Sequence, residues 1–249
     1  QPWCDGKVGT LGESYEAGVQ SALACLRPPH LAAMIPAYGC SSYYHHAMRH
    51  NGALEMRFFC YAFSMAASSQ EVRGKPELAR LIAHAGDTEI WDWLRIGHIR
   101  PGCSPLRHTP SYEQWLLDIL NHTCHDAYWR SMGYGPLPYY DTHADVPTLY
   151  FGGWYDSYTR STVENFVSLR ARGSAPIHLL MGPWEHGSRG GDVNVGDARF
   201  PVGVGRLDYD EIHLRWFDRW LKGVDNAVER EDPVQYFIMG NGPEQDPVQ

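Results

Sequence analysis

The sequence predicts an α/β protein in which a parallel sheet is flanked by helices and interrupted by a largely helical segment. Two stretches carry this prediction: residues 7–37 and residues 146–181 each read as an apolar strand, a helix and another apolar strand. Parallel strands need a crossover connection between them, so this order is typical of a parallel sheet. Between the two stretches, apolar residues recur with helical spacing.

The first unit starts after the turn-forming pair Asp5-Gly6. Residues 7–12 read as a short buried strand, and residues 13–26 as a helix with its apolar side chains on one face. The prolines at 28 and 29 end that helix, because proline removes a backbone donor and clashes with the preceding turn. Residues 31–37 then form a second apolar strand.

The second unit repeats the order. Its strand, helix and strand are expected at residues 146–152, 161–172 and 176–181. Gly173 follows the helix, as glycine often does at helix C-termini. A last helix places Ile212, Trp216 and Trp220 on one face and ends before Gly223.

These patterns predict four segments: the first part of the core, a helical cap, the second part of the core, and the start of a β-rich C-terminal domain. Their boundaries are residues 1–44, 45–145, 146–228 and 229–249. The strand expected at 233–239 would open the last segment. The chain lacks an initiator Met and stops soon after that strand, so we interpret it as an excerpt of a longer protein.

Composition excludes several classes of protein. The formal net charge is −8 and no cluster of Lys or Arg occurs, which argues against a nucleic-acid partner. No apolar run approaches the roughly 20 residues of a membrane span, so no membrane partner is expected. The six cysteines form no CxxC pair and do not suggest a disulfide framework. This favours a reducing compartment, and we expect a cytoplasmic protein whose oligomeric state is left open.

A candidate nucleophile lies between the first strand and its helix, in the sequence GESYEAG around Ser14. A serine at such a turn is lifted above the sheet edge, beside the free N–H groups of the helix N-terminus. The strict G-x-S-x-G pattern fails because position 16 is Glu. The alternative is an ordinary serine that caps the helix.

Two further candidates follow the strands of the second unit. Asp156 comes directly after GGWY, where a carboxylate could orient a histidine; the alternative is a helix cap. His186 lies in the loop GPWEHG, where a general base could be exposed; the alternative is a solvent-facing histidine. Ser14, Asp156 and His186 occur in the order expected of α/β-hydrolases, each after a different strand. We therefore predict a Ser-Asp-His triad.

The chain resembles the cocaine-esterase and X-prolyl dipeptidyl-peptidase-like serine hydrolases, which have the α/β-hydrolase fold. The stretches that carry the resemblance are QPWCDGKVGTLGESYEAG, ACLRPPHLAAMIP, HDAYWR, VPTLYFGGWYDSYTRSTVENF, HLLMGPWEHG and LRWFDRWLKGVDNAV. They cover most of the chain except the middle of the cap. The resemblance implies hydrolysis of an ester or amide, such as an X-Pro peptide bond, through an acyl-enzyme and without a cofactor.

The resemblance also implies roles for other residues. The N–H of Tyr15 would form half of the oxyanion hole, and the other half would be a tyrosine hydroxyl from a segment before residue 1. Related α-amino-acid ester hydrolases carry carboxylates where this chain has Tyr158 and Thr159, which argues against that subgroup despite Glu16. Tyr158 matches an aromatic of the acyl pocket in esterase relatives, with core packing as the alternative.

Tyr38, Tyr43 and Tyr44 follow the second strand and are further candidates for the substrate pocket. Histidines at the start of the cap and around residues 122–125 suggest a metal site, but four matched ligands are not evident, so none is expected. Two alternatives to a serine hydrolase stay open: an inactive binding protein on the hydrolase fold, and a metal-dependent hydrolase that uses cap histidines.

Overall fold

The computed structural model describes residues 2–95, 99–187, 193–201 and 203–240. The chain divides into two compact units, one of residues 1–46 and 130–249 and the other of residues 47–129. We name them the sheet unit and the helical unit. None of the described helices combines the length and the hydropathy that crossing a membrane requires.

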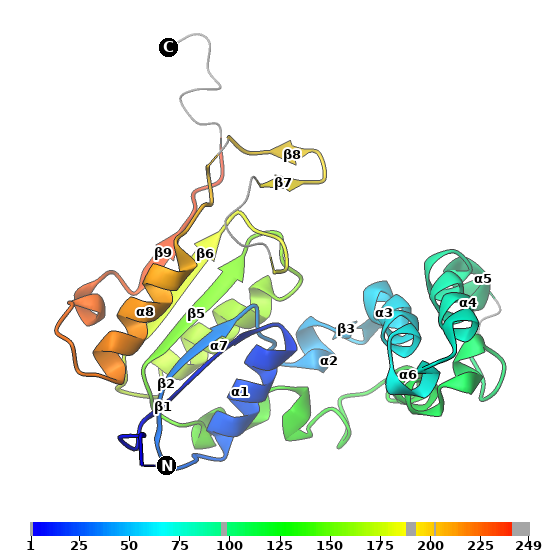
Figure 1. The fold of residues 1–249 in the computed structure, drawn as a ribbon, viewed down its shortest axis with the longest axis horizontal. Coiled ribbons are helices and arrows are strands. Elements are labelled where there is room, and N and C mark those ends of the chain that lie inside the picture. Colours follow the sequence, from blue (N-terminus) through cyan, green and yellow to red (C-terminus); the bar gives the residue numbers. More distant parts are fainter. Residues whose placement is uncertain (1, 96–98, 188–192, 202, 241–249) are drawn as a thin grey trace, which may run out of the picture. The chain divides into compact units, whose positions relative to one another are not determined.

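The sheet unit is built on five parallel strands in the order β1-β2-β5-β6-β9 (Figure 1). The strands are β1 (Val8–Glu13), β2 (Leu31–Ala37), β5 (Thr148–Gly153), β6 (Ile177–Gly182) and β9 (Val234–Tyr236). All four strands expected from the apolar runs of the two units are present. Because the strands are parallel, their carboxyl ends meet at one edge of the sheet.

Helices cover both faces of this sheet (Figure 1). They are α1 (Tyr15–Cys25), α7 (Thr159–Arg170) and α8 (Tyr209–Trp220). Alternate residues of β5 point to opposite faces, as strand geometry requires. Phe151 packs with Trp216 of α8, whereas Tyr150 packs with Phe166 of α7. Trp216 is fully buried, as the apolar face expected for the last helix predicts.

Short elements complete the sheet unit. They are α2 (Tyr43–His46), the 3-10 turns η3 (Met132–Tyr134), η4 (Leu137–Thr142) and η5 (Val228–Arg230), and the hairpin β7 (Asn194–Val195) and β8 (Ala198–Arg199). The strand that we expected to open a further domain is β9, and it lies in the main sheet, where it pairs in parallel with β6. Its backbone finds hydrogen-bond partners there: Leu179 N donates to Pro233 O at 2.8 Å.

The helical unit packs three main helices around an apolar cluster. The helices are α3 (Met56–Ala67), α4 (Pro76–Asp87) and α6 (Pro110–Asn121), with α5 (Ile90–Arg95), η1 (Gln70–Val72), η2 (Pro105–His108) and the hairpin β3 (Arg49–His50) and β4 (Ala53–Leu54). Phe63, Ile82 and Leu116 are fully buried in this cluster. Leu81, which the helical spacing of α4 includes in the same face, is 46% exposed because it lies at the edge of that face.

The boundaries of the helical unit differ from those expected for the cap at 45–145. Residues 130–145 belong to the sheet unit, where the Tyr140 hydroxyl donates to Asn165 Oδ1 of α7 at 2.8 Å. Tyr140 is also packed among the buried residues of β5, β6 and α7. Prolines break this segment into short turns, so its sequence pattern does not show that it packs on the sheet helices.

Asp145 connects the segment before β5 with the turn before β6. Its carboxylate accepts hydrogen bonds from Ser174 N at 2.9 Å, Ala175 N at 3.0 Å and Ser174 Oγ at 3.0 Å. The two backbone N–H groups lower the pKa of Asp145 below its ordinary value, because they stabilise the charged form. A lowered carboxyl pKa contributes stability that is present above the unfolded pKa and is lost as the pH falls through the folded pKa.

We expect Asp145→Asn to lower the free energy of unfolding by about 1 kcal/mol at pH 7, a value that allows for the exposure of the carboxylate. The difference from wild type should shrink as the pH falls from 7 toward 3, because the lowered pKa stabilises only the charged carboxylate and this contribution declines below the unfolded pKa. Urea unfolding at both pH values measures this. The control is Asp141→Asn, since that side chain is 90% exposed and pairs with Arg172. An Asp145→Asn effect that is equal at both pH values would contradict the prediction.

Candidate active site

Ser14 lies in the turn between β1 and α1 with an unusual backbone conformation. Its φ is 60° and its ψ is −123°, a region that non-glycine residues rarely adopt. Its N–H donates to Ala37 O at the end of β2, at 2.9 Å, which holds the turn against the neighbouring strand. The Ser14 side chain makes no cap hydrogen bond to α1. The strained turn therefore points the hydroxyl away from its own helix.

Ser14, His186 and Asp156 form a continuous chain of hydrogen bonds. Ser14 Oγ lies 2.8 Å from His186 Nε2, and His186 Nδ1 lies 2.9 Å from Asp156 Oδ1. The three residues follow β1, β6 and β5, whose carboxyl ends lie at the same edge of the sheet. The structure thus brings together residues that are up to 172 positions apart in the sequence.

Burial differs along this chain of side chains. The Asp156 side chain is fully buried, whereas the His186 side chain is 33% exposed. Asp156 Oδ2 is buried too and has no hydrogen-bond partner among the described residues. Asp156 Oδ1 also accepts a hydrogen bond from Ser157 Oγ at 3.4 Å, and it orients the imidazole through Nδ1. The arrangement suits a histidine that accepts a proton from a hydroxyl.

The loops after β5 and β6 interlock next to these residues. Trp154 N donates to Gly182 O at 2.9 Å, and Tyr155 N donates to Trp184 O at 3.1 Å. A Cβ on Gly153 would lie 2.1 Å from Trp184 O, so only glycine permits this approach. Trp184 is itself 2% exposed, and its indole N–H donates to Gly205 O at 2.8 Å. The interlock fixes Asp156 and His186 relative to each other.

The N-terminus of α1 faces the same edge of the sheet. Tyr15 is the first residue of α1, and an N–H in the first turn has no carbonyl acceptor within its own helix. The dipole of α1 also places partial positive charge at this end. The Tyr15 N–H can therefore stabilise an oxyanion that forms next to Ser14.

The tyrosines expected around the site occupy different positions. The ring of Tyr158 is tilted against the imidazole of His186 at 5.2 Å, and Tyr43 makes an edge contact with Tyr158 at 6.3 Å. Tyr38 makes an edge contact with the same imidazole at 5.9 Å but is only 1% exposed. Tyr44 is largely buried and contacts the His45 ring. Tyr158 and Tyr43 thus extend from the imidazole as a row of rings.

Position 159, where the amino-acid ester hydrolases carry a carboxylate, has a threonine with a local role. Thr159 Oγ1 lies 2.5 Å from Gly153 O and 2.6 Å from Asp156 O, so its one proton is shared between these two carbonyl oxygens. Its hydroxyl therefore supports the backbone that carries Asp156.

Trp184 and Tyr209, which also support the site, were not singled out from the sequence, because an aromatic residue in a loop or helix does not reveal its partners.

The histidines that suggested a metal site have other partners. His46 Nε2 pairs with Glu164 Oε2 at 2.8 Å, and Ser41 Oγ donates to the same oxygen. Although burial raises it, these hydrogen bonds bring the pKa of Glu164 below its ordinary value. His122 Nδ1 lies 2.6 Å from Asp126 Oδ2. Within the described part of the chain, no group of three or more His, Cys, Asp or Glu side chains is arranged to hold a metal ion.

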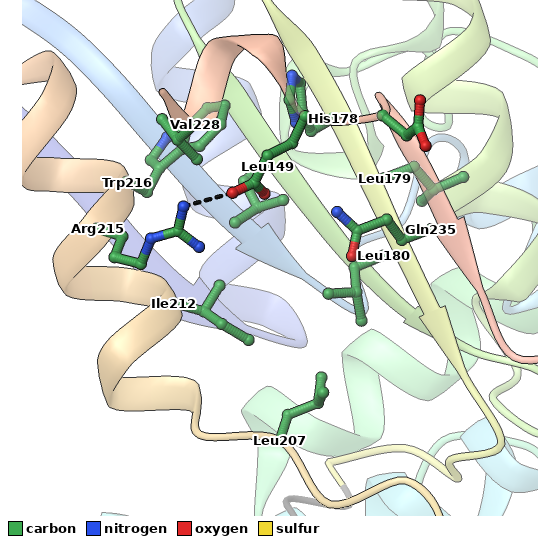
Figure 2. Close-up of a pocket in the computed structure, with 12 residues that line it drawn as sticks. Leu149, His178, Leu179, Leu180, Leu207, Ile212, Arg215, Trp216, Val228 and Gln235 are labelled. Atoms are coloured by element: carbon green, nitrogen blue, oxygen red, sulfur yellow. Dashed lines mark hydrogen bonds and ion pairs between the residues drawn. The ribbon is translucent and has the colours of Figure 1, made fainter. Parts of the chain in front are cut away.

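A cavity of about 130 Å³ lies between α8 and the sheet (Figure 2). Leu149, Ile212 and Trp216 line it, together with an ion pair between Arg215 and Glu231. His178 of β6 also lines it, and burial lowers the pKa of this histidine. No residue of the candidate triad lines this cavity, so we assign it to core packing rather than to substrate binding.

Solved structures share this fold. A CocE/NonD family hydrolase of Staphylococcus aureus matches 95% of this chain and 33% of its own, with a TM-score of 0.54 and 20% identity. An aminopeptidase of a marine sediment Thaumarchaeota archaeon matches 95% of this chain and 38% of its own, with a TM-score of 0.59 and 20% identity. An α-amino acid ester hydrolase matches 94% and 37%, with a TM-score of 0.52 and 19% identity. The protein thus has an α/β-hydrolase fold.

Sequence comparison identifies the family. The family of X-Pro dipeptidyl-peptidases (S15 family) matches residues 1–188, and the chain belongs to it. The cocaine esterase of Rhodococcus sp. (strain MB1 Bresler) is 26% identical over 96% of this chain and 42% of its own length. A putative serine esterase of Mycobacterium bovis is 25% identical over 96% of this chain and 41% of its own. The chain therefore spans about two fifths of the length of these relatives.

The close contact between the loops after β5 and β6 allows a test of whether it positions His186. We expect Gly153→Ala to displace Trp184, and His186 with it, because the new Cβ would overlap a backbone carbonyl oxygen. Displacement of a reacting group by about 1 Å can cost about 100-fold in rate. The rate at which a fluorophosphonate modifies Ser14 should fall by about this factor. Gly133→Ala is the control, since its Cβ would meet no atom within 4 Å. Equal rates for the two variants would contradict the prediction.

Proposed function

We propose that this chain carries the catalytic residues of a serine hydrolase that cleaves an ester or amide bond through an acyl-enzyme. The observation that carries this proposal is the hydrogen-bonded chain from Ser14 Oγ through His186 to Asp156. Membership of the S15 family supports it, because that family is described as X-Pro dipeptidyl-peptidases and the two named relatives are esterases. An X-Pro dipeptide amide is one substrate within this class.

In the proposed reaction, Ser14 Oγ attacks the substrate carbonyl carbon while His186 Nε2 takes the hydroxyl proton. The Tyr15 N–H stabilises the oxyanion of the tetrahedral intermediate. His186 then gives the proton to the leaving alcohol or amine, which leaves an acyl-enzyme on Ser14. A water molecule that His186 deprotonates releases the acid. Asp156 keeps Nδ1 protonated and stabilises the imidazolium.

We infer further that the helical unit is the cap of this hydrolase. It is inserted between β2 and β5, that is, between the strand that neighbours the nucleophile and the strand that precedes Asp156. Insertions at this position of the chain follow the carboxyl end of a strand, where ligands of open α/β sheets bind. The expected absence of a cofactor and the cytoplasmic location belong to the same proposal.

We expect Ser14→Ala to abolish labelling by a fluorophosphonate and to lower kcat for an ester by about 10⁶-fold, because the nucleophile is lost. The measurement combines mass spectrometry of the labelled protein with p-nitrophenyl butyrate hydrolysis, using the full-length protein. Ser157→Ala, which changes the residue next to Asp156 and removes a 3.4 Å contact to its carboxylate, is the matched serine control. It should remain labelled at Ser14.

Other outcomes separate the alternatives. Labelling at a serine other than 14 would refute the assignment of the nucleophile. Activity that a chelator abolishes and a phosphonate leaves intact would favour a metal-dependent hydrolase. If the wild-type protein shows neither fluorophosphonate labelling nor ester hydrolysis, a binding protein on a hydrolase fold would be favoured.

The residues at 158 and 159 predict a preference among esters. Neither Tyr158 nor Thr159 has a carboxylate that could hold a substrate ammonium. Tyr158 is moreover only 5% exposed, and the Thr159 hydroxyl is bound to backbone carbonyls. We expect kcat/KM for methyl phenylacetate to exceed that for phenylglycine methyl ester, which shares its leaving group and adds an ammonium, by at least about tenfold. Steady-state kinetics of the two esters measure the ratio. A preference for the amino-acid ester would instead indicate an ammonium site elsewhere, with Glu16 as the first residue to replace by Gln.

A further inference from the structure

Tyr38 occupies a constrained position directly after β2. Its φ is 53°, which is uncommon for a residue with a side chain and persists where the surroundings hold it. Its backbone N–H donates to Phe151 O of β5 at 2.8 Å. This hydrogen bond continues the pairing of β2 with β5 past the end of β2. The backbone therefore directs the Tyr38 side chain into the interior beneath the sheet edge.

The Tyr38 ring lies against the proposed general base. It is 1% exposed and meets the His186 imidazole edge-on, with the ring centres 5.9 Å apart and the planes at 69°. His186 needs such support, because its side chain is 33% exposed and Gly187, with φ 73°, follows it directly. Packing on the buried side restricts rotation of an imidazole that is otherwise open to solvent.

Tyr38 is itself anchored by Tyr209, the first residue of α8. The two hydroxyl groups form a hydrogen bond. Tyr209 also contacts the rings of Phe151 at 5.5 Å and of Trp184 at 6.0 Å. One tyrosine pair thus joins the end of β2, the start of α8 and the loop that carries His186.

The charges around Tyr38 exclude a proton-transfer role. Burial, then the hydrogen bond to Tyr209, and then the nearby carboxylates of Asp156 and Glu13 raise the pKa of Tyr38 far above its ordinary value. These effects all favour the neutral phenol. A neutral, buried ring whose hydroxyl is anchored to Tyr209 acts on His186 through packing.

We propose that the Tyr38–Tyr209 pair positions the His186 imidazole, with the Tyr38 ring restricting its orientation and the Tyr209 hydroxyl holding that ring in place. This inference rests on the proposed function, since it assigns a role in the movement of a proton through His186. The imidazole must keep Nδ1 on Asp156 and Nε2 toward Ser14 while it accepts and returns the proton. Small rotations break both contacts, and rates depend steeply on such geometry.

The test compares three variants of the full-length protein in ester hydrolysis and in fluorophosphonate labelling. Tyr38→Leu removes the ring and should lower kcat by about 100-fold, with KM within about twofold of wild type. Tyr38→Phe keeps the ring and loses only the hydrogen bond, so it should recover most of this loss. Tyr209→Phe removes the same hydrogen bond from the other side and should match Tyr38→Phe.

Two further variants sharpen the comparison. Tyr38→Phe combined with Tyr209→Phe should be no slower than either single variant, because both changes remove one shared interaction. Tyr236→Phe, whose side chain is 59% exposed on β9, is the control and should keep wild-type kinetics. Thermal unfolding of each variant identifies loss of folding, and Tyr38→Phe, which keeps the packed volume, provides the result if Tyr38→Leu does not fold.

Defined outcomes would overturn the inference. An unchanged kcat in Tyr38→Leu would do so, and so would a rise in KM alone, since that would place Tyr38 in contact with substrate. Independent, multiplying losses in the double variant would overturn the coupling of the two tyrosines. Failure of the proposed function looks different: the wild-type protein itself would then show no labelling at Ser14. If wild type is labelled and the variants are labelled equally fast, only the positioning role fails.

Discussion

The parallel pairing of β5 with β6 is the constraint on which the candidate site depends. Its register sets Gly153 opposite Gly182, so the loops that carry Asp156 and His186 leave the sheet side by side. Backbone hydrogen bonds continue across the same edge: Ser14 N to Ala37 O, Tyr38 N to Phe151 O, and Trp154 N to Gly182 O. The ends of four neighbouring strands are thus linked in sequence, and the candidate residues extend from these links.

The environment of the three residues changes from interior to surface within a short distance. Asp156 is buried beneath the edge, His186 is partly exposed between two tyrosine rings, and Ser14 lies at the N-terminus of α1. This change in burial meets two different requirements of the proposed acyl transfer. The carboxylate is kept from water, where its charge would be screened, while the hydroxyl stays accessible to a substrate.

Much of this arrangement could be predicted from the sequence, because it depends on local patterns. Apolar runs predicted the strands β1, β2, β5 and β6, and helical spacing predicted the last helix. The positions of Ser14, Asp156 and His186 after three of these strands predicted that their side chains meet at one edge of the sheet. The contact between Tyr38 and Tyr209 could not be predicted, because it joins residues far apart in the chain that no pattern relates. Residues 130–145 were expected in the cap for a similar reason: their short turns show no periodicity, and their place on the sheet unit is revealed by long-range contacts such as the packing of Tyr140 and its buried hydrogen bond to Asn165.

The interlock between Gly153 and Trp184 has a dynamic consequence. Asp156 and His186 lie on loops that share hydrogen bonds and a close backbone contact, which hold the two loops together. Ser14 lies in a different strand–helix turn, and β2 separates its strand from β5. Thermal fluctuation of the edge therefore changes the separation of hydroxyl and imidazole more readily than that of imidazole and carboxylate. The distance between Ser14 Oγ and His186 Nε2 is therefore the most variable distance of the site, and heating should lengthen it before the contact between His186 and Asp156 breaks.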